Sequence, residues 1–292
     1  MTGGWTIGVI GGSGLYAIDA LEDQHWIDLD TPWGKPSDQL LTGHIGDVRF
    51  VFLPRHGRGH RIPPGEVNAR ANIYALKAAG CTDVVAISAV GSLREELSPG
   101  RFVVVDQFID RTVARPASFF GTGLVAHVSL ADPTCERLSA LCADAAAAAG
   151  ADVTRGGTYL AMEGPQFSSR AESQLYRQWG ADVIGMTAMP EARLAREAEL
   201  PYALVGMVTD YDCWRGAGEK VEVAAVIAQL GANAELGRRL VEELAQALPA
   251  ERTPSLVDNV LDLALITAPD ARDPAMIDKL GVLLDRALGR QL

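Results

Sequence analysis

Two carboxylates follow one of the most apolar runs of the chain. Residues 204–208 carry only apolar side chains or none, and Asp210 and Asp212 come next with one residue between them. Because a strand alternates its side chains, both acids would point the same way if the extended form continued. Such a pair can accept two N–H groups, or can hold a proton if burial raises one pKa. The alternative is a loop whose acids cap the next helix, and position alone favours neither reading.

Groups that could bind an anion follow other apolar runs. They are Ser13 in a glycine turn, Arg55 with His56, Ser88 with Ala89, and Thr187. Backbone N–H groups, hydroxyls and a guanidinium fork together suit a phosphate. The glycine turn lacks the spacing of dinucleotide-binding and Walker loops. A turn without a ligand, and a solvated basic loop over residues 55–61, are the alternatives, while a metal site at His56 and His60 lacks an interleaved Cys or acid.

An aromatic side chain follows a Gly-Pro turn. Phe167 could stack on a flat ring, and Ser168 and Ser169 could cap the next helix, although core packing is the more ordinary role of a phenylalanine. An anion pocket, a stacking plane and paired acids together suit cleavage of a nucleoside by phosphate.

The elements that must position these groups alternate along the chain. Apolar runs predict strands over residues 5–10, 48–53, 83–87, 102–109, 158–162, 182–186 and 204–208. Helical patterns cover residues 67–79, 135–149, 171–179, 192–199 and 221–248, and residues 28–44 and 111–127 are expected to form a hairpin or loop and a long loop. This alternation predicts an α/β fold, in which ligands bind at the carboxyl ends of the strands.

Composition excludes several classes of partner. The 292 residues are 48% hydrophobic and carry a formal net charge of −11, which argues against nucleic acid. An anionic substrate would need a local positive site. Four scattered cysteines without a CxxC motif favour a reduced, cytoplasmic protein, and neither a signal peptide nor a membrane-spanning run is expected.

Eight motifs, in order along residues 7–245, resemble the methylthioadenosine-cleaving branch of the trimeric purine nucleoside phosphorylase family. They are Gly11-Gly12-Ser13-Gly14-Leu15, Arg55-His56-Gly57, Asn68 with Ala71-Asn72-Ile73, Gly91-Ser92-Leu93-Arg94-Glu95-Glu96, Asp106-Gln107-Phe108-Ile109-Asp110-Arg111-Thr112, Glu163-Gly164-Pro165-Gln166-Phe167-Ser168-Ser169-Arg170-Ala171-Glu172-Ser173, Met186-Thr187 with Pro190-Glu191, and Thr209-Asp210-Tyr211-Asp212-Cys213-Trp214. The resemblance implies a single-domain fold with a central twisted mixed sheet flanked by helices. It also implies a catalytic domain over residues 1–250 and a helical tail of unknown role over residues 251–292.

The resemblance implies a role for each matching position. Phosphate would be held by Ser13, Arg55, His56, Ser88, Ala89 and Thr187. The nucleoside would contact Phe167, Ser168 and Met186, with Val223, Val226 and Ile227 around its 5' group and His127 reaching in from a neighbouring subunit. Asp210 would protonate N7 with a pKa raised by burial and by Asp212, while Asp212 would accept from the 6-amino group.

The implied reaction is reversible phosphorolysis of S-methyl-5'-thioadenosine to adenine and 5-methylthioribose 1-phosphate, in purine and methionine salvage. Phosphate is a co-substrate, no metal or organic cofactor is implied, and the assembly would be a homotrimer or a dimer of trimers. The alternative is a broader purine nucleoside phosphorylase acting on adenosine, 5'-deoxyadenosine, methylthioinosine or 6-oxopurine nucleosides. A hydrolase or a catalytically silent trimer would be a different class.

One departure from the family pattern lies inside a motif. Gly185 stands where an Asn is expected before Met186-Thr187, so we expect a side chain to be missing near ribose and base, with looser specificity. Val90 replaces a Cys, and Ser13 replaces a Thr but keeps the hydroxyl. The tail beyond Pro254 matches no motif, which leaves the 5' substituent open.

Overall fold

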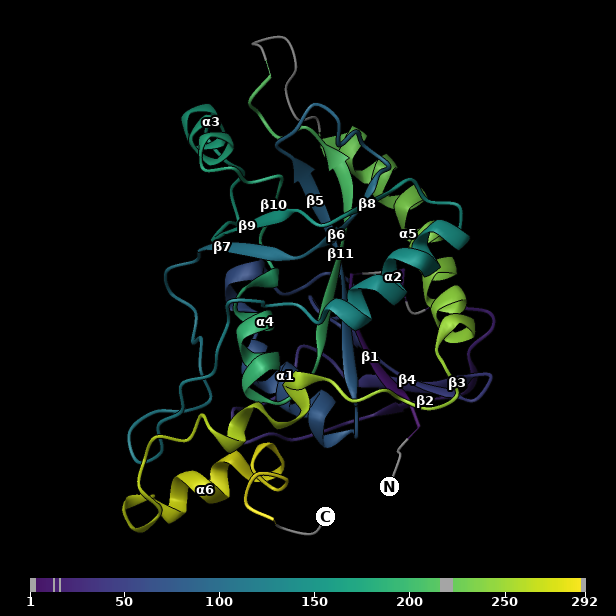
Figure 1. Cartoon of the computed structure of the whole chain (residues 1–292). Helices are drawn as coiled ribbons and strands as arrows, with labels where there is room; N and C mark the ends of the chain where they lie inside the picture. The colour runs from purple at the N-terminus through teal and green to yellow at the C-terminus, as the bar shows by residue number, and fades with distance from the viewer. Residues whose placement is uncertain (1–3, 13, 16, 216–222, 290–292) are drawn as a thin grey trace.

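A single mixed sheet organises the molecule. The computed structural model describes residues 4–12, 14–15, 17–215 and 223–289, without the side chains of residues 223–227. Within them the sheet has eleven strands, and Figure 1 shows helices on both of its sides. The strands are β1 (Thr6–Gly11), β2 (Glu22–Ile27), β3 (Leu40–Ile45), β4 (Val48–Pro54), β5 (Asp83–Ser92), β6 (Phe102–Val105), β7 (Gln107–Arg111), β8 (Val153–Arg155), β9 (Thr158–Met162), β10 (Val183–Gly185) and β11 (Tyr202–Asp210).

Six α-helices and four short 3-10 helices complete the described elements. They are α1 (Ala69–Ala78), α2 (Glu136–Ala148), α3 (Arg170–Gln178), α4 (Ala188–Glu197), α5 (Val223–Ala247), α6 (Pro274–Leu280), η1 (Pro64–Glu66), η2 (Leu256–Asp262), η3 (Pro269–Ala271) and η4 (Gly281–Leu283). The α/β prediction is confirmed. No described helix is long and apolar enough to cross a membrane.

The long strand β5 is the centre of the sheet. Along one edge it pairs with β11 from Val84 onward. Along the other edge it pairs with β1 only as far as Ala86, and then with β10 from Gly91. β1 and β10 therefore part beside residues 87–90, and this opening in the sheet positions the site.

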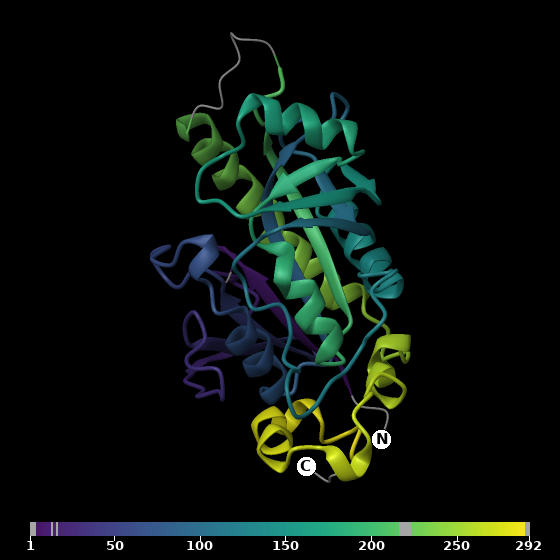
Figure 2. The same ribbon diagram turned by 90° about the vertical axis from the view of Figure 1, so that its left-hand side faces the viewer.

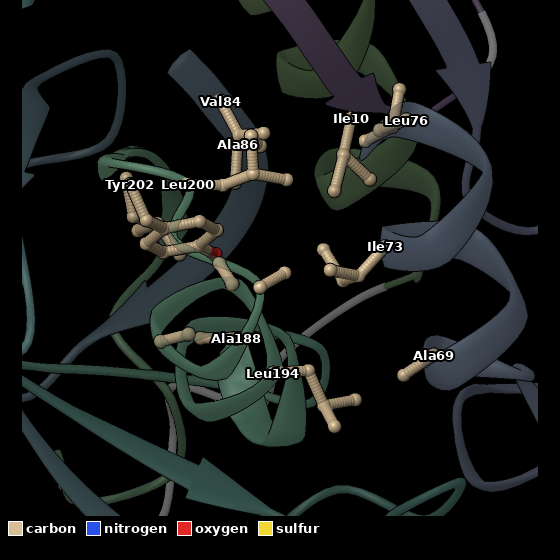
Figure 3. Packing of buried hydrophobic residues seen from close by; sticks show 14 of the residues in the cluster. Ile10, Ala69, Ile73, Leu76, Val84, Ala86, Ala188, Leu194, Leu200 and Tyr202 are labelled. Atoms are coloured by element: carbon tan, nitrogen blue, oxygen red, sulfur yellow. The ribbon is translucent and has the colours of Figure 1, made fainter. Parts of the chain in front are cut away.

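Both faces of the central strands are buried, as the apolar runs predicted. In β11, Ala203, Val205 and Met207 face one core, whereas Leu204 and Val208 face the other. On the second face, Figure 3 shows Ile73 and Leu76 of α1 and Leu194 of α4 gathered with Ile10, Val84 and Ala86 of the sheet. Such packing on two sides explains why the runs show no polar alternation.

Residues 251–289 pack against the end of the sheet where β5 and β11 begin. Figures 1 and 2 both place this segment there, opposite the carboxyl ends of those strands. Leu261, Leu280 and Leu284 are buried in the same core as α1 and α4. Ion pairs add to the contact, because Arg252 donates to Asp83 at 2.5 Å and Arg286 donates to Glu199 at 2.6 Å.

One predicted strand is two strands in the structure. The apolar run 102–109 breaks at Asp106, where β6 leaves β11 and β7 joins β9. Asp106 Oδ1 accepts from the N–H of Gly157 at 3.0 Å at this crossing. The polar residues Asp106 and Gln107 interrupt the run at this point, so the prediction of one continuous strand was wrong, and the two halves pair with different distant strands. Residues 28–44 form a loop that ends in β3, β8 was not predicted, and α4 begins four residues before its predicted start.

Candidate active site

A cavity of about 650 Å³ opens where β1 and β10 part beside β5. It is lined by side chains from the carboxyl ends of several strands and from the loops after them. The expected site residues that line it are Arg55, His56, Ser88, Ala89, Phe167, Met186, Thr187, Asp210 and Asp212. Residues that are scattered over more than 150 positions thus meet in one site, as the strand-end argument predicted.

Arg55 is held rigidly at one end of the cavity. Its side chain is 2% exposed, and Nε and Nη2 donate to the two carboxylate oxygens of Glu191 at 2.6 and 3.1 Å. Nη1 and Nη2 also donate to the carbonyls of Ile87 and Ile10. The fork that we expected for phosphate is therefore bound to Glu191. Of its five N–H groups, one on Nη1 has no partner among the described residues, and Glu191 balances the positive charge.

His56 is a neutral imidazole beside this charge. Burial, followed by the charge of Arg55, lowers its pKa to about 4. Nδ1 lies 2.8 Å from the carbonyl of Ile62, and a carbonyl only accepts, so Nδ1 carries the proton. Nε2 is then an acceptor, which suits a protonated phosphate oxygen.

Two hydroxyls complete the polar end. The Ser88 and Thr187 hydroxyls lie 3.1 Å apart, although they come from β5 and from the residue before α4. Thr187 is the N-cap residue of α4, yet its side chain makes no capping hydrogen bond. Both hydroxyls can therefore turn toward an anion in the cavity.

Asp210 and Asp212 lie at the end of the cavity opposite the two hydroxyls. The register along β5 gives the distance between the two ends. Gly91 is the register partner of Asp210, and it stands three residues after Ser88. At about 3.3 Å per residue, the hydroxyl end and the acid end are about 10 Å apart along the strand. A Cβ at Gly91 would lie 3.2 Å from Asp210 Oδ1, so the glycine leaves room for this carboxylate.

The two acids do not continue the strand. β11 ends at Asp210, and Asp212 has a left-handed φ of 50°, so the expected alternation of an extended chain is wrong here. Instead the N–H of Asp212 donates to Asp210 Oδ1 at 2.8 Å, while the Thr209 hydroxyl donates to Asp210 Oδ2 at 2.7 Å. Both carboxyl groups still line the cavity, but a turn at Asp212 places them there instead of a continued strand.

Asp212 is the acid whose pKa the fold raises. Burial is the main cause and the charge of Asp210 adds to it, while the nearby Ser173 hydroxyl opposes the rise. Its Oδ2 is buried and makes no well-formed hydrogen bond with the described residues. In the sequence-based mechanism Asp212 is the neighbour that accepts from the 6-amino group, and it is this acid whose pKa the fold raises.

Phe167 lies at the rim of the cavity with 59% of its surface exposed. The core-packing alternative for this ring is wrong, and the ring is accessible to a flat ligand. Ser168 is buried behind the wall instead, where its hydroxyl donates to Met162 Sδ at 3.7 Å and its carbonyl accepts from Cys213.

Some expected site residues are not gathered here. His127 is exposed and lines a second cavity of about 590 Å³ that shares no residue with the first. Ser13 lies outside the described residues, as do the side chains of Val223, Val226 and Ile227 in α5. Leu230 and Ala234 continue that helix at helical spacing, and both line the cavity.

Two positioning side chains were missed by the sequence reading. Glu191 reads as an acid in a helix, but it is 1% exposed and binds both Arg55 and the hydroxyl of Tyr202. Tyr159 reads as a core residue of β9, but its hydroxyl accepts from the N–H of Thr187. Glu191 lay inside a family motif, which was a usable signal, whereas nothing in the sequence marks Tyr159.

The gap expected at Gly185 is not open. A Cβ at this position would lie 2.1 Å from the hydroxyl oxygen of Tyr159, so the tyrosine fills the space.

The described residues contain no group of three or more His, Cys, Asp or Glu side chains that could hold a metal ion.

Comparison with known proteins places this geometry among enzymes. The family model of the phosphorylase superfamily matches residues 6–246. The chain is 60% identical to the S-methyl-5'-thioadenosine phosphorylase of Cereibacter sphaeroides over 284 residues, which cover 97% of this chain and 98% of the relative.

Solved structures agree with the sequence relatives. A methylthioadenosine phosphorylase from an Antarctic soil metagenomic library superposes with a TM-score of 0.91 at 44% identity, over 96% of this chain and 99% of that chain. A variant of the adenosine/methylthioadenosine phosphorylase of Schistosoma mansoni, in complex with methylthioadenosine, gives 0.80 at 39% identity, over 85% of this chain and 93% of that chain.

Proposed function

The chain belongs to the phosphorylase superfamily, and we propose that it cleaves S-methyl-5'-thioadenosine with phosphate, giving adenine and 5-methylthioribose 1-phosphate. This reversible transfer makes it a pentosyltransferase in purine and methionine salvage. One observation carries the proposal: anion-binding groups and paired acids stand at opposite ends of one cavity, about 10 Å apart along β5. That spacing suits a nucleoside with phosphate at C1'.

At the polar end, phosphate is bound by Ser13, Arg55, His56, Ser88, Ala89 and Thr187. The buried Arg55, held by Glu191, contributes the Nη1 N–H that has no partner among the described residues, and the two hydroxyls can donate to phosphate oxygens. The neutral His56 accepts the proton of a monohydrogen phosphate at Nε2. Phosphate held in this way attacks C1' and stabilises the positive charge that develops there.

At the other end, the acid pair acts on the purine. The leaving base needs a proton at N7, and the proton belongs to the pair of Asp210 and Asp212 rather than to one residue. Asp210 delivers it, while Asp212 Oδ2, which lacks a partner among the described residues, accepts from the 6-amino group. A carboxylate would repel O6 of a 6-oxopurine, so adenine is favoured. Phe167 stacks on the base.

The sugar lies between these ends. Met186 contacts the ribose, and Val223, Val226 and Ile227 surround the methylthio group. The support for the second assignment is that Leu230 and Ala234, on the next turns of α5, line the cavity. Ser168 supports the base-binding wall from behind.

We also propose a homotrimer, with a dimer of trimers as the larger form. His127 cannot serve the cavity of its own chain, because it lines a separate one, so a role in nucleoside binding needs a neighbouring copy. The exposed apolar side chains of Val125, Leu263 and Ile266 lie near this loop and support an interface there. Light scattering in solution tests this assembly by its mass.

We further propose that no metal or organic cofactor takes part, since proton transfer and phosphate attack need none. Four free cysteine thiols support a reducing, cytoplasmic location. The anion-binding groups around Arg55 serve a small anion, not a nucleic acid or a membrane surface.

The deciding experiment incubates the protein with methylthioadenosine, adenosine, methylthioinosine and inosine, each with and without phosphate. Free adenine from methylthioadenosine only in the presence of phosphate is the expected result. Equal release without phosphate would indicate a hydrolase instead, and no release would indicate a silent binding protein.

A broader specificity is the second candidate. It is favoured by the name of the Schistosoma mansoni relative, which includes adenosine. The adenosine arm of the same assay measures it, and a kcat/KM for adenosine close to that for methylthioadenosine would support it.

A further inference from the structure

The hydroxyl of Tyr159 occupies the space of a side chain at position 185. Tyr159 on β9 is fully buried and pairs with Val183 of β10, two residues before Gly185 on the same face. A Cβ at 185 would lie 2.1 Å from the hydroxyl oxygen, 2.7 Å from Cζ and 3.1 Å from Cε2 of the tyrosine. Because real Cβ contacts under 3.0 Å are essentially never seen, a side chain at 185 would require the Tyr159 ring to move.

The same hydroxyl binds the segment that follows β10. The N–H of Thr187 donates to it at 3.3 Å. From the other side, Arg115 Nη1 donates to the carbonyls of Met186 and Met189 at 2.6 and 2.8 Å. The backbone between β10 and α4 is therefore held at two points, and the Tyr159 contact is the one at Thr187 itself.

The side chain of Thr187 makes its contacts with the Ser88 and Tyr159 hydroxyls instead of with the helix that it precedes. It does not cap α4, and its hydroxyl lies 3.1 Å from that of Ser88 at the polar end of the cavity. Tyr159 does not line the cavity, so its effect on a bound anion must pass through the residues that it contacts, of which Thr187 lines the cavity.

We propose that Tyr159 is a positioning residue for phosphate: its hydroxyl fixes the Thr187 backbone, so that the Thr187 hydroxyl faces the anion, and Gly185 provides the space that this hydroxyl needs. The proposal rests on the proposed function, because it takes phosphate as the anion. It implies that phosphate affinity depends on a side chain outside the cavity, and that residues 159 and 185 are energetically coupled.

The first test is Tyr159→Phe, which removes the hydroxyl and keeps the ring. The partly buried N–H of Thr187 loses its partner, and we expect KM for phosphate to rise about tenfold while KM for the nucleoside stays within about twofold. Tyr74→Phe is the matched control, because it removes a partly buried tyrosine hydroxyl in α1, outside the cavity. An unchanged KM for phosphate, or an equal rise in both KM values, would overturn the proposal.

The second test examines the coupling between residues 159 and 185. Gly185→Ala alone should lower the melting temperature, since the new Cβ meets the Tyr159 ring even without its hydroxyl. In Tyr159→Leu the colliding atoms are gone, so the double variant should be more stable than the sum of the two single losses predicts. Simple additivity would contradict the claim that Gly185 exists to accommodate Tyr159.

Both tests are separable from the proposed function. If the wild-type protein shows no phosphate-dependent cleavage, the reaction is wrong, and the melting-temperature rise that inorganic phosphate produces replaces KM as the measure of affinity. If phosphate raises the melting temperature of Tyr159→Phe as much as that of the wild type, the positioning role of Tyr159 is wrong.

Discussion

The backbone N–H of Asp212 donates to Asp210 Oδ1 at 2.8 Å, so the second acid fixes the carboxylate of the first. The contact is possible because Asp212 has a left-handed φ of 50°, which turns the chain back on itself after β11. In this arrangement Asp210 has donors on both oxygens, whereas Asp212 is buried and its Oδ2 has no well-formed hydrogen bond within the described part of the chain. The two acids are thus chemically different, although the sequence presents them as a pair.

Asp210→Asn tests the proton donor. An amide can keep the contact with the Asp212 N–H but cannot deliver a proton, so we expect turnover to fall by about 10²–10⁴-fold. Phosphate binding should hardly change, because the polar end lies about 10 Å away along β5. Steady-state kinetics with methylthioadenosine measure the first effect, and the stabilisation by phosphate measures the second. Turnover near that of the wild type would rule out the acid role.

Asp212→Asn tests recognition of the purine. The amide can donate to O6, whereas the carboxylate accepts from the 6-amino group, so preference should move toward 6-oxo nucleosides. We expect the ratio of kcat/KM for methylthioinosine over methylthioadenosine to rise by at least about tenfold. Cys213→Ser, next along the chain, serves as a control for disturbance of the turn. A ratio that stays constant in Asp212→Asn would mean that this acid does not read the 6 position.

The strands and helices of the fold were largely predictable from local pattern. Residues 158–162 form β9 as predicted, and the run 204–208 lies inside β11, because burial on both faces leaves a continuous apolar signal. The partners of the two halves were not predictable from the run, although Asp106 and Gln107 interrupt it and mark the break. Both halves pair with strands more than 40 residues later in the chain.

The site was predictable in composition but not in detail. Strand ends converge at one edge of a sheet, so polar residues after Leu53, Ile87 and Met186 could be expected to meet. The partner of Arg55 could not be expected from spacing alone, because Glu191 lies 136 residues away and forms the ion pair through tertiary packing. The contact of the Tyr159 hydroxyl with Thr187 could not be expected either, since an aromatic residue in a strand is usually a core residue.

Glu191→Gln tests the support of Arg55. Both side chains are about 2% exposed, and removing one charge leaves the other buried without its partner. We expect a loss of about 3 kcal/mol in the free energy of unfolding and a higher KM for phosphate, because the guanidinium loses its orientation. Chemical denaturation and kinetics at varied phosphate measure the two effects.

The control for Glu191→Gln is an ion pair at the surface. Asp144→Asn breaks the pair with Arg155, whose side chains are 64% and 55% exposed, and it should change stability by no more than about 0.5 kcal/mol. Losses of similar size in the two variants would show that the buried Arg55–Glu191 pair stabilises the fold no more than an exposed ion pair does.

The lowered pKa of His56 predicts a pH dependence of stability. Burial and Arg55 lower this pKa from 6.5 to about 4, so between these values the unfolded state binds the proton and the native state does not. Stability is therefore fully present above pH 6.5 and is lost as the pH falls toward 4, by about 1–2 kcal/mol at pH 5. His56→Gln lacks the titrating group, so its free energy of unfolding should fall less between pH 7 and 5. Urea unfolding at fixed protein concentration measures how the free energy of unfolding changes with pH in the wild type and in His56→Gln. His44→Gln in β3 is the control for loss of an imidazole outside the cavity. If wild type and His56→Gln have parallel slopes, His56 is not held neutral by the fold, and the acceptor role of Nε2 toward phosphate loses its basis.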